Sequence, residues 1–443
     1  MDMNMNEFTS RVLEAAQAAG ISPAEVSAFE EASFSASARE GKLERYEVSD
    51  SLNIILRGKS GARIGTASTQ ALDEESIDLL IRGVRESAEL IDTDEQDEIM
   101  PPDEKYETVV NFSEALEDVS AQEKIALAMD IDRRMNGVDA RLKVDDSTVC
   151  TSRTTFTLRN TLGLDLTHTN NEIHAYTSVL AQEGEHSATG FHIRWGYGLQ
   201  DVPAAELVRD CAEEALGNLH AGRMKSGTVP VVIKYSAMAD LLTTFCGIFS
   251  ADNAQQGLSL LAGREGETIA SEHVTLVDDP LMPWGMSSRP FDREGAATYT
   301  KNVIEGGVLK TLLHNRKTAK KAGVHTTGNA AGSGHVSPSN LYIAPGEATL
   351  EELLAEMGDG LYLTEVTGLH AGANAVSGDF SLLSRGFEVK DGKIARAVEQ
   401  FTVAGNFYEL LKDIQKVGSD LTFVASPFGC PSVRVGSLSI AGE

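Results

Sequence analysis

One glycine-rich segment, Thr367 to Phe380, carries side chains that could bind a ligand. It reads Thr-Gly-Leu-His-Ala-Gly-Ala-Asn-Ala-Val-Ser-Gly-Asp-Phe. His370 can exchange a proton near neutral pH, Asp379 could orient its ring, and the glycines let a ligand approach the backbone closely. The alternative is a turn in which Asp379 accepts hydrogen bonds from nearby amides. The segment therefore predicts substrate binding, without a catalytic role, by His370, Asn374, Ser377 and Asp379.

No histidine pattern in the chain predicts a metal site. A zinc peptidase needs two or three imidazoles or carboxylates that converge on the ion, and a general base beside the bound water. The chain has no His-Glu-x-x-His pattern, and Glu272-His273 has no second histidine within one helical turn. One alternative is a set of histidines on consecutive predicted strands. Because six residues of a strand span roughly 20 Å, these could share an ion only by pairing across a hairpin: His168, His174, His186 and His192.

The first half of the chain predicts two units with the same order of elements. In residues 4–92, a helix is followed by strand-like runs and a second helix. In residues 118–220, Ser120 and Glu123 form a capping box that opens a helix, and strand-like runs and another helix follow. The shared order indicates a duplicated α+β unit.

An acidic stretch separates the two units, and strands dominate the C-terminal half. Asp92 to Glu107 contains Pro101-Pro102 and few apolar residues, so we expect a linker. Further on, Asp391-Gly392 lies between two strand-like runs and is typical of a hairpin turn with positive φ at both positions. The predicted fold class is α+β, with a C-terminal antiparallel sheet or open barrel and short helices. The expected domains are residues 1–105, 106–224 and 225–443.

Charge and composition exclude several classes of function. With 66 acidic and 38 basic residues, the net charge is -28, which argues against nucleic-acid binding. The densest basic run, Arg316 to Lys321, is short. No apolar run approaches the roughly 18 residues that cross a bilayer, and the N-terminus does not resemble a secretory signal. Because the four cysteines lie far apart, we expect reduced thiols and a cytoplasmic protein.

Five segments together resemble the TldD/PmbA family over roughly residues 225 to 443. They include the segment described first and four others: Thr275 to Pro280, Thr327 to Ala330, Ala404 to Asn406 and Val417 to Leu421. An older label of that family is modulator of DNA gyrase, and the acidic composition gives this label no support.

The resemblance implies a two-partner metallopeptidase in which one type of chain holds zinc on a helical His-Glu-x-x-x-His motif. Here the corresponding positions fall near Leu242, Thr243 and Gly247, and none of these can bind zinc. The chain thus resembles the PmbA (TldE) type, with no metal of its own and zinc expected in a partner chain. The resemblance also implies that zinc-bearing members use a late cysteine as a third zinc ligand. Cys430 lies displaced from that position. The implied substrates are small unfolded peptides.

Two other functions stay open at this stage. One is a self-sufficient peptidase or hydrolase built around His370 and Asp379, and the other is a non-enzymatic binding or regulatory homodimer. Gly332-Ser-Gly-His335 does not match the Gly-x-Ser-x-Gly pattern of a nucleophilic serine. Its surroundings, Gly328 to Ser339, read as a loop that the resemblance places near a peptide cleft. Homodimer and heterodimer are not distinguished by the sequence.

Overall fold

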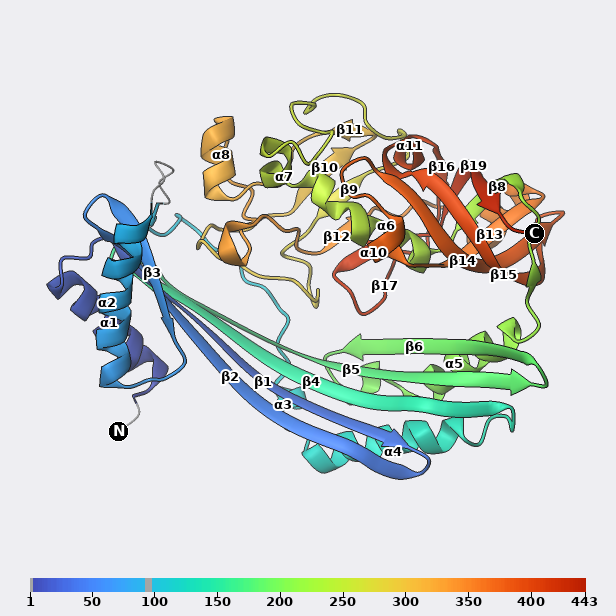
Figure 1. Ribbon diagram of the computed structural model, residues 1–443, viewed down its shortest axis with the longest axis horizontal. Coiled ribbons are helices and arrows are strands. Elements are labelled where there is room, and N and C mark those ends of the chain that lie inside the picture. The colour runs from blue at the N-terminus through green and yellow to red at the C-terminus, as the bar shows by residue number, and fades with distance from the viewer. Residues whose placement is uncertain (1–2, 92–97) are drawn as a thin grey trace.

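The computed structural model describes residues 3–91 and 98–443. Residues 92–97, in the expected linker, lie outside the described residues. Figure 1 shows two parts: a long curved sheet built from the N-terminal half, and a C-terminal part that faces the concave side of that sheet. The rest of the linker packs on the C-terminal part, since Asp103 Oδ2 accepts from Ala297 N at 2.7 Å and Tyr106 Oη donates to Gly295 O at 2.9 Å.

The N-terminal half forms one antiparallel sheet of six strands in the order β3-β2-β1-β4-β5-β6. The two predicted units are joined because β1 pairs with β4 from Glu25 opposite Asn160 to Ala38 opposite Ser147. Each unit contributes three neighbouring strands, which matches the predicted duplication. The strands are β1 (Ala24–Arg39), β2 (Lys42–Ser60), β3 (Arg63–Thr69), β4 (Leu142–Asn160), β5 (Asp165–Glu183) and β6 (His186–Gly196).

Helices flank each set of strands, and side chains cap the first turns of the first four; the sequence predicts the cap at Ser120. Asp73 accepts from Ser76 N at 2.8 Å, and the Ser120 side chain and Glu123 form the expected capping box. Apolar side chains of the first two helices pack at one end of the sheet, and those of α4 and α5 pack at the other. The helices are α1 (Met5–Ala18), α2 (Glu74–Leu90), α3 (Glu114–Glu117), α4 (Ala121–Met135) and α5 (Ala204–Asn218).

Five strands of the C-terminal part close into a barrel in the order β19-β8-β13-β14-β15. Pairing of Thr402 with Ala441 and of Ala404 with Ser439 closes the ring between β15 and β19. The predicted turn at Asp391-Gly392 is present, with φ of 49° and 73°. The barrel strands are β8 (Gly227–Ile233), β13 (Gly360–Thr367), β14 (Asp379–Lys390), β15 (Lys393–Asn406) and β19 (Val433–Ala441), with β7 (Gly222–Arg223) and β16 (Ile414–Val417) beside them.

A second sheet lies beside the barrel in the order β11-β10-β9-β12-β18-β17. Its strands are β9 (Leu276–Asp278), β10 (Lys301–Glu305), β11 (Val308–Leu309), β12 (Leu341–Ile343), β17 (Thr422–Phe423) and β18 (Phe428–Cys430). The helices of this part are short, as predicted. They are α6 (Tyr235–Phe245), α7 (Ala251–Gln255), α8 (Arg316–Ala322), α9 (Leu350–Met357), α10 (Leu369–Gly372) and α11 (Phe407–Lys412).

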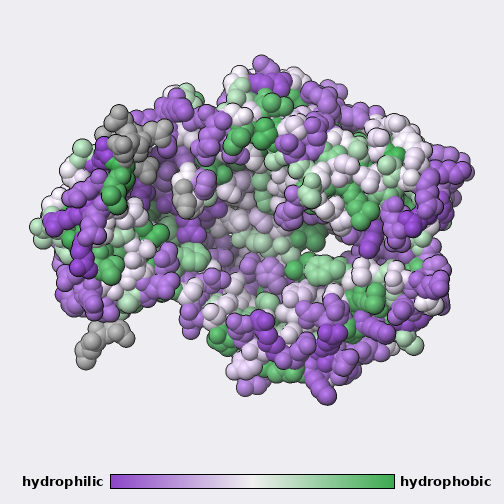
Figure 2. Space-filling model, in the orientation of Figure 1, coloured by the Kyte–Doolittle hydropathy of each residue, from purple (hydrophilic) through white to green (hydrophobic). Residues whose placement is uncertain are grey.

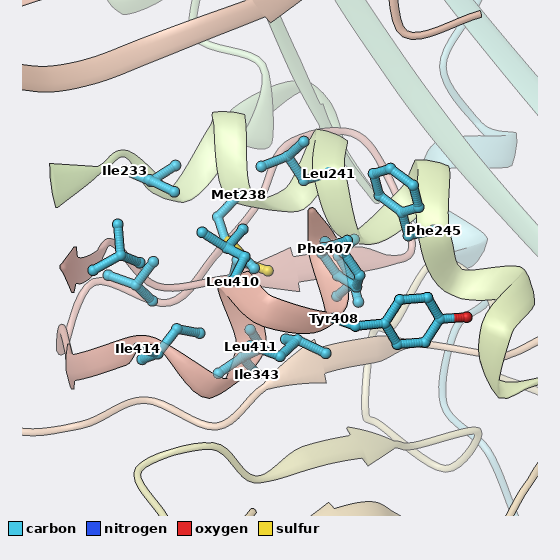
Figure 3. Close-up of a cluster of buried hydrophobic side chains, with 14 of the residues drawn as sticks. Ile233, Met238, Leu241, Phe245, Ile343, Phe407, Tyr408, Leu410, Leu411 and Ile414 are labelled. Atoms are coloured by element: carbon cyan, nitrogen blue, oxygen red, sulfur yellow. The ribbon is translucent and has the colours of Figure 1, made fainter. Parts of the chain in front are cut away.

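The largest apolar core lies in the C-terminal part. Figure 3 shows Met238, Leu241 and Phe245 of α6 beside Phe407 and Leu410 of α11. The rings of Phe245 and Phe407 stack with centroids 4.7 Å apart. The α+β class is therefore confirmed. Among the described residues, we find no helix with the length and apolar character needed to cross a membrane.

Candidate functional site

A cavity of about 290 Å³ lies where the N-terminal sheet meets the barrel. Figure 2 shows the molecule hollowed between these two parts. The end of β5 and the start of β6 form one wall, and β13, β14 and β15 form the other. The lining residues are Leu180, Ser187, Ala188, Thr189, Glu365, Thr367, Leu383, Ser384, Arg385, Glu399 and Gln400.

Arg385 bridges the two walls of this cavity. Its guanidinium donates to Thr189 O at 3.5 Å and to Thr189 Oγ1 at 3.3 Å. It also lies 3.4 Å from Glu365 and 4.0 Å from Glu399. Gln400 adopts φ of 55°, a conformation that costs energy in a residue other than glycine and that is frequent at binding sites. The cavity therefore presents polar and charged groups together with apolar surface from Leu180, Ala188 and the exposed Leu383.

Shifted pKa values occur at Asp240 and Glu214, which lie near Glu365, and at His192, which lies 3.5 Å from Glu214. Burial, followed by the charge of Glu365, raises the pKa of Asp240 to about 6. Asp240 nevertheless keeps contact with solvent. Burial also raises the pKa of Glu214, whose carboxylate accepts from Phe191 N at 3.0 Å. The pKa of His192 is lowered to about 4, by burial first and then by the charge of Lys234.

The predicted binding segment forms the connection between β13 and β14. Its first residue, Thr367, lines the cavity, but the four predicted binding residues do not. Asn374 Oδ1 accepts from the amides of Val376 and Ser377 at 3.0 and 3.1 Å. Asp379 accepts from Ser377 Oγ and from Asn406 Nδ2, both at 2.8 Å. Three of the four predicted residues are thus brought together, but by a turn network that holds its own polar groups.

His370 is exposed on α10 and stands apart from that network. Among the described residues, no hydrogen bond or ion pair involves the His370 side chain. Asp379 does not orient it, because both carboxylate oxygens of Asp379 are bound to Ser377 and Asn406. Those two bonds also lower the pKa of Asp379, with Asn406 as the larger cause. Peptide binding by the four residues stays a prediction.

Helix α6 occupies the place at which the resemblance would put a zinc-binding helix, and its residues do not fit that metal. Leu242 is buried in the core, and Thr243 Oγ1 donates to Ala239 O at 2.8 Å. Gly247 has no side chain to offer. Cys430 is fully buried on β18, and burial raises the pKa of its thiol, so the thiolate that zinc prefers is disfavoured.

The four histidines of the metal alternative do not pair across a hairpin. His192 lies opposite Thr177, His174 lies opposite Trp195, and each contacts a glutamate instead. The ring of His186 approaches His220 at 4.9 Å between centroids. In the part of the chain that the structure describes, no group of three or more His, Cys, Asp or Glu side chains is arranged to hold a metal ion. The side chain of Ser333 is not among the described ones.

Two of the family segments meet in a buried polar network that the sequence reasoning missed. Asp278, on β9, accepts from Lys301 Nζ at 2.9 Å, from Asn329 Nδ2 at 2.8 Å and from Ser339 N at 2.6 Å. Asp278 is fully buried, and the Lys301 side chain is 5% exposed. One signal was available: Asp278 directly follows Leu276 and Val277 at the end of a buried strand, and a buried carboxylate needs a cation or several donors. The choice of Lys301 as that cation was not readable from the sequence.

A third family segment, Val417 to Leu421, has a similar structural role. Asp420 accepts from Ser432 N at 2.8 Å and from Ser432 Oγ at 2.7 Å, and Gly418 N donates to Ser432 O at 2.7 Å. Ser432 Oγ in turn accepts from Tyr235 N at the start of α6. These contacts link β16, β19 and α6, so the motif fixes the position of the helix.

Family models match nearly the whole chain in three consecutive pieces. The PmbA/TldA metallopeptidase domain 1 matches residues 24–88, the central domain matches 114–219, and the C-terminal domain matches 226–442. They cover both N-terminal units as well as the region of resemblance. The boundaries at 105 and 224 predicted from the sequence are not tested by these matches.

Similar proteins include a Metalloprotease PmbA of Escherichia coli O157:H7, 30% identical over 60% of this chain and 57% of its own length. A Metalloprotease of Methanothermobacter thermautotrophicus is 30% identical over 76% of this chain and 77% of its own length. The match to the E. coli relative thus spans less than two thirds of that relative.

Solved structures share the fold. A candidate modulator of a DNA gyrase from Thermotoga maritima superposes with a TM-score of 0.92 and 33% identity, over 99% of this chain and 100% of the other. TldE from Thermococcus kodakarensis has a TM-score of 0.89 over 98% and 100%, and its 22% identity supports likeness of fold alone. Taken together with the motifs and the two-part architecture, these matches show that the chain belongs to the PmbA/TldD metallopeptidase family.

Proposed function

We propose that this chain is a zinc-free subunit of a PmbA/TldD-type metallopeptidase and acts together with a zinc-bearing homologue. The proposal rests on the residue types of α6, which are mostly apolar. Its inward face is apolar, with Leu241, Leu242 and Phe245 in the core, and Asp240 is its one carboxylate. A single carboxylate does not make a zinc site, which needs three protein ligands. The homologue would supply the metal, the activated water and the general base.

The role proposed for this chain is to bind unfolded peptide in the cavity between the sheet and the barrel. The cavity offers hydrogen-bonding side chains from β13, β14 and β15 and three apolar wall residues, Leu180, Ala188 and Leu383. Such a mixture suits a peptide, whose backbone needs polar partners and whose side chains need apolar contact. The substrates would be small unfolded polypeptides, since a folded domain would not enter a space of about 290 Å³.

Peptide would be held by side chains of the cavity rather than by extension of β6. Thr189 O and Phe191 N lie on the edge of β6 that faces away from β5, and they are already bound by Arg385 and Glu214. An added strand would have to break these bonds. The reaction would take place in the cytoplasm, which suits four free cysteines.

The first test is the zinc content of the chain, purified alone and without a histidine tag, by elemental analysis. We expect a value near zero, and no cleavage of an unfolded peptide by this chain alone. Adding the zinc-bearing homologue should produce cleavage. One zinc per chain, or cleavage by the chain alone, would refute the proposal.

A second measurement separates peptide binding from assembly with the homologue. Anisotropy of a labelled unfolded peptide reports binding to this chain by itself. A self-sufficient hydrolase would instead show turnover that His370→Ala abolishes, and a regulatory homodimer would bind peptide without any effect of the homologue.

A further inference from the structure

Both tryptophans of the chain lie in one cluster of aromatic rings, where the N-terminal sheet meets the C-terminal part. Trp195 lies on β6, Tyr197 directly follows that strand, and Trp284 lies in the loop between β9 and β10. The ring centroids of Trp195 and Tyr197 are 5.8 Å apart, and those of Tyr197 and Trp284 are 4.7 Å apart. We call these three residues the aromatic cluster. Neighbouring ring faces of this kind can contact an apolar or a cationic group.

Trp284 adopts a backbone conformation that a bulky residue disfavours. Its φ is 58°, in the left-handed region, and its amide donates to Val110 O at 2.7 Å. The side chain is nevertheless 45% exposed, and no hydrogen bond among the described residues involves its Nε1. Packing within the chain therefore does not explain why a strained position carries a large ring. Backbone strain of this kind is concentrated at ligand-binding sites.

The other two rings are fixed by hydrogen bonds to the C-terminal part. Trp195 Nε1 donates to Phe423 O of β17 at 3.3 Å, and Tyr197 Oη donates to Gly285 O at 3.3 Å. Figure 1 shows the end of β6 next to β17. Because these rings are already ordered, a ligand that contacts them loses little affinity to the cost of ordering side chains.

One carboxylate lies beside the cluster, on the same face of the sheet. His174 is opposite Trp195 in the pairing of β5 with β6, so Glu172, two residues before His174, shares the face of Trp195. Burial, followed by the charge of Glu172, raises the pKa of Tyr197. Glu172 contacts His174 Nε2 at 3.0 Å, and among the described residues no Lys or Arg forms an ion pair with it. The cluster therefore lies beside a carboxylate that has no Lys or Arg partner.

From these rings and this carboxylate we infer a binding site for a cationic side chain, Lys or Arg, of an extended peptide. The faces of aromatic rings attract cations, and tryptophan does so most strongly. Glu172 adds direct attraction for a cation and repels an anion. The net charge of -28 further raises the local concentration of cationic ligands.

The same face of β5 and β6 connects this site with the cavity. Leu180 and Thr189 line the cavity, are opposite each other on the two strands, and share a face with Trp195. Between the two sites, Phe191 on this face is 55% exposed and offers apolar contact. From Thr189 to Tyr197 the strand spans roughly 26 Å, so a peptide of about eight residues or more reaches both sites. This connection rests on the peptide binding proposed above, whereas the cation site itself does not.

Tryptophan fluorescence reports on the site directly, because both tryptophans lie in it. The purified chain is titrated with two unfolded peptides of about twelve residues that differ at one position, lysine or norleucine. Norleucine has nearly the length of lysine and lacks its charge. We expect the lysine peptide to change the tryptophan fluorescence and to bind about tenfold more tightly than the norleucine peptide. Equal affinities would overturn the inference.

Two variants each remove one part of the site. In anisotropy measurements with labelled peptides, Trp284→Leu and Glu172→Gln should each reduce the preference for lysine over norleucine at least threefold. Tyr46→Leu is the matched control, because Tyr46 is 57% exposed and β1, β4 and β5 lie between its strand and β6. This variant should keep the full preference. A preference that survives both site variants would place the lysine elsewhere and refute the assignment.

Failure of this site and failure of the proposed function give different results. N-acetyl-lysine methylamide carries its one charge on the side chain, and it is too short to need the cavity. If this compound changes the fluorescence, its norleucine counterpart does not, and neither peptide binds more tightly than the compound, the cation site stands and the proposed peptide binding is wrong. If both peptides bind equally and the compound has no effect, the peptide binding stands and the cation site is wrong.

Discussion

Replacement of Lys301 by methionine tests the energetic role of the buried network around Asp278. The change keeps an unbranched, largely apolar side chain but removes the charge and the hydrogen bonds to Asp278 and Asn329. The carboxylate of Asp278 would remain fully buried with two of its three donors, Asn329 Nδ2 and Ser339 N. The loss is therefore an uncompensated buried charge rather than a cavity.

The expected magnitude follows from the burial of the pair. Breaking a buried ion pair by removal of one partner costs about 3 to 5 kcal/mol, and loss of one hydrogen bond to a charged group costs about 1.5 to 3 kcal/mol. Because two donors to Asp278 remain, we expect about 3 kcal/mol. For a domain of this size that corresponds to a fall in Tm of roughly 6 to 12 °C.

Scanning calorimetry of the C-terminal transition measures the effect, with Lys310→Met as the matched control. Lys310 lies 3.2 Å from Glu305, but both side chains are about half exposed. Such a pair contributes about 0 to 1 kcal/mol, so the control should lose less than roughly 4 °C. The double variant, Lys301→Met with Asp278→Asn, removes both charges and should recover part of the loss. If Lys301→Met lowers Tm no more than Lys310→Met, the network is not an important source of stability.

Three further predictions concern other parts of the chain. Because the pKa of His192 is lowered to about 4 in the folded state, the unfolded state takes up the proton first as pH falls below about 6.5, and the free energy of unfolding should be about 2 kcal/mol smaller at pH 5. His192→Gln should therefore reduce the difference in Tm between pH 7.5 and pH 5. Gly65→Ala would place Cβ 1.9 Å from Val84 O and should destabilise the N-terminal part by about 1 to 3 kcal/mol or more in denaturant unfolding. In the same assay Gly217→Ala, whose Cβ would meet open space in α5, should stabilise that part by about 1 kcal/mol. Arg385→Ala should weaken anisotropy-detected binding of an unfolded peptide about tenfold, or about 1.4 kcal/mol, with an unchanged circular dichroism spectrum; undiminished affinity would exclude the cavity as the peptide site.

The candidate site was only partly readable from the sequence. Asn374, Ser377 and Asp379 are brought together, because residues two to five apart in a glycine-rich turn meet through local hydrogen bonds. The pairing of Asp379 with His370 did not appear, since Asn406, 27 residues further on, takes one oxygen of that carboxylate. A local sequence pattern does not predict a hydrogen-bond partner on another strand, as Asn406 is for Asp379.

The cavity was missed for the same reason. Thr189 and Arg385 are 196 residues apart in the chain, and each is unremarkable in its own strand. They meet because the N-terminal sheet curves toward the barrel. The positive φ of Gln400 likewise depends on the register of β14 and β15, which shifts between Ser384 and Gly386.

The sequence by itself determined the local elements, the repeated order of the N-terminal units, the apolar character of α6 and the family. These follow from short-range physics: helix caps, the period of apolar residues, turn residues and the identity of side chains at given positions. Tertiary structure decided that β1 pairs with β4, that β15 and β19 close the barrel, and that Asp278 meets Lys301 and Asn329. Those contacts join residues far apart in the chain, and they are selected by the packing of whole sheets, which no short segment encodes.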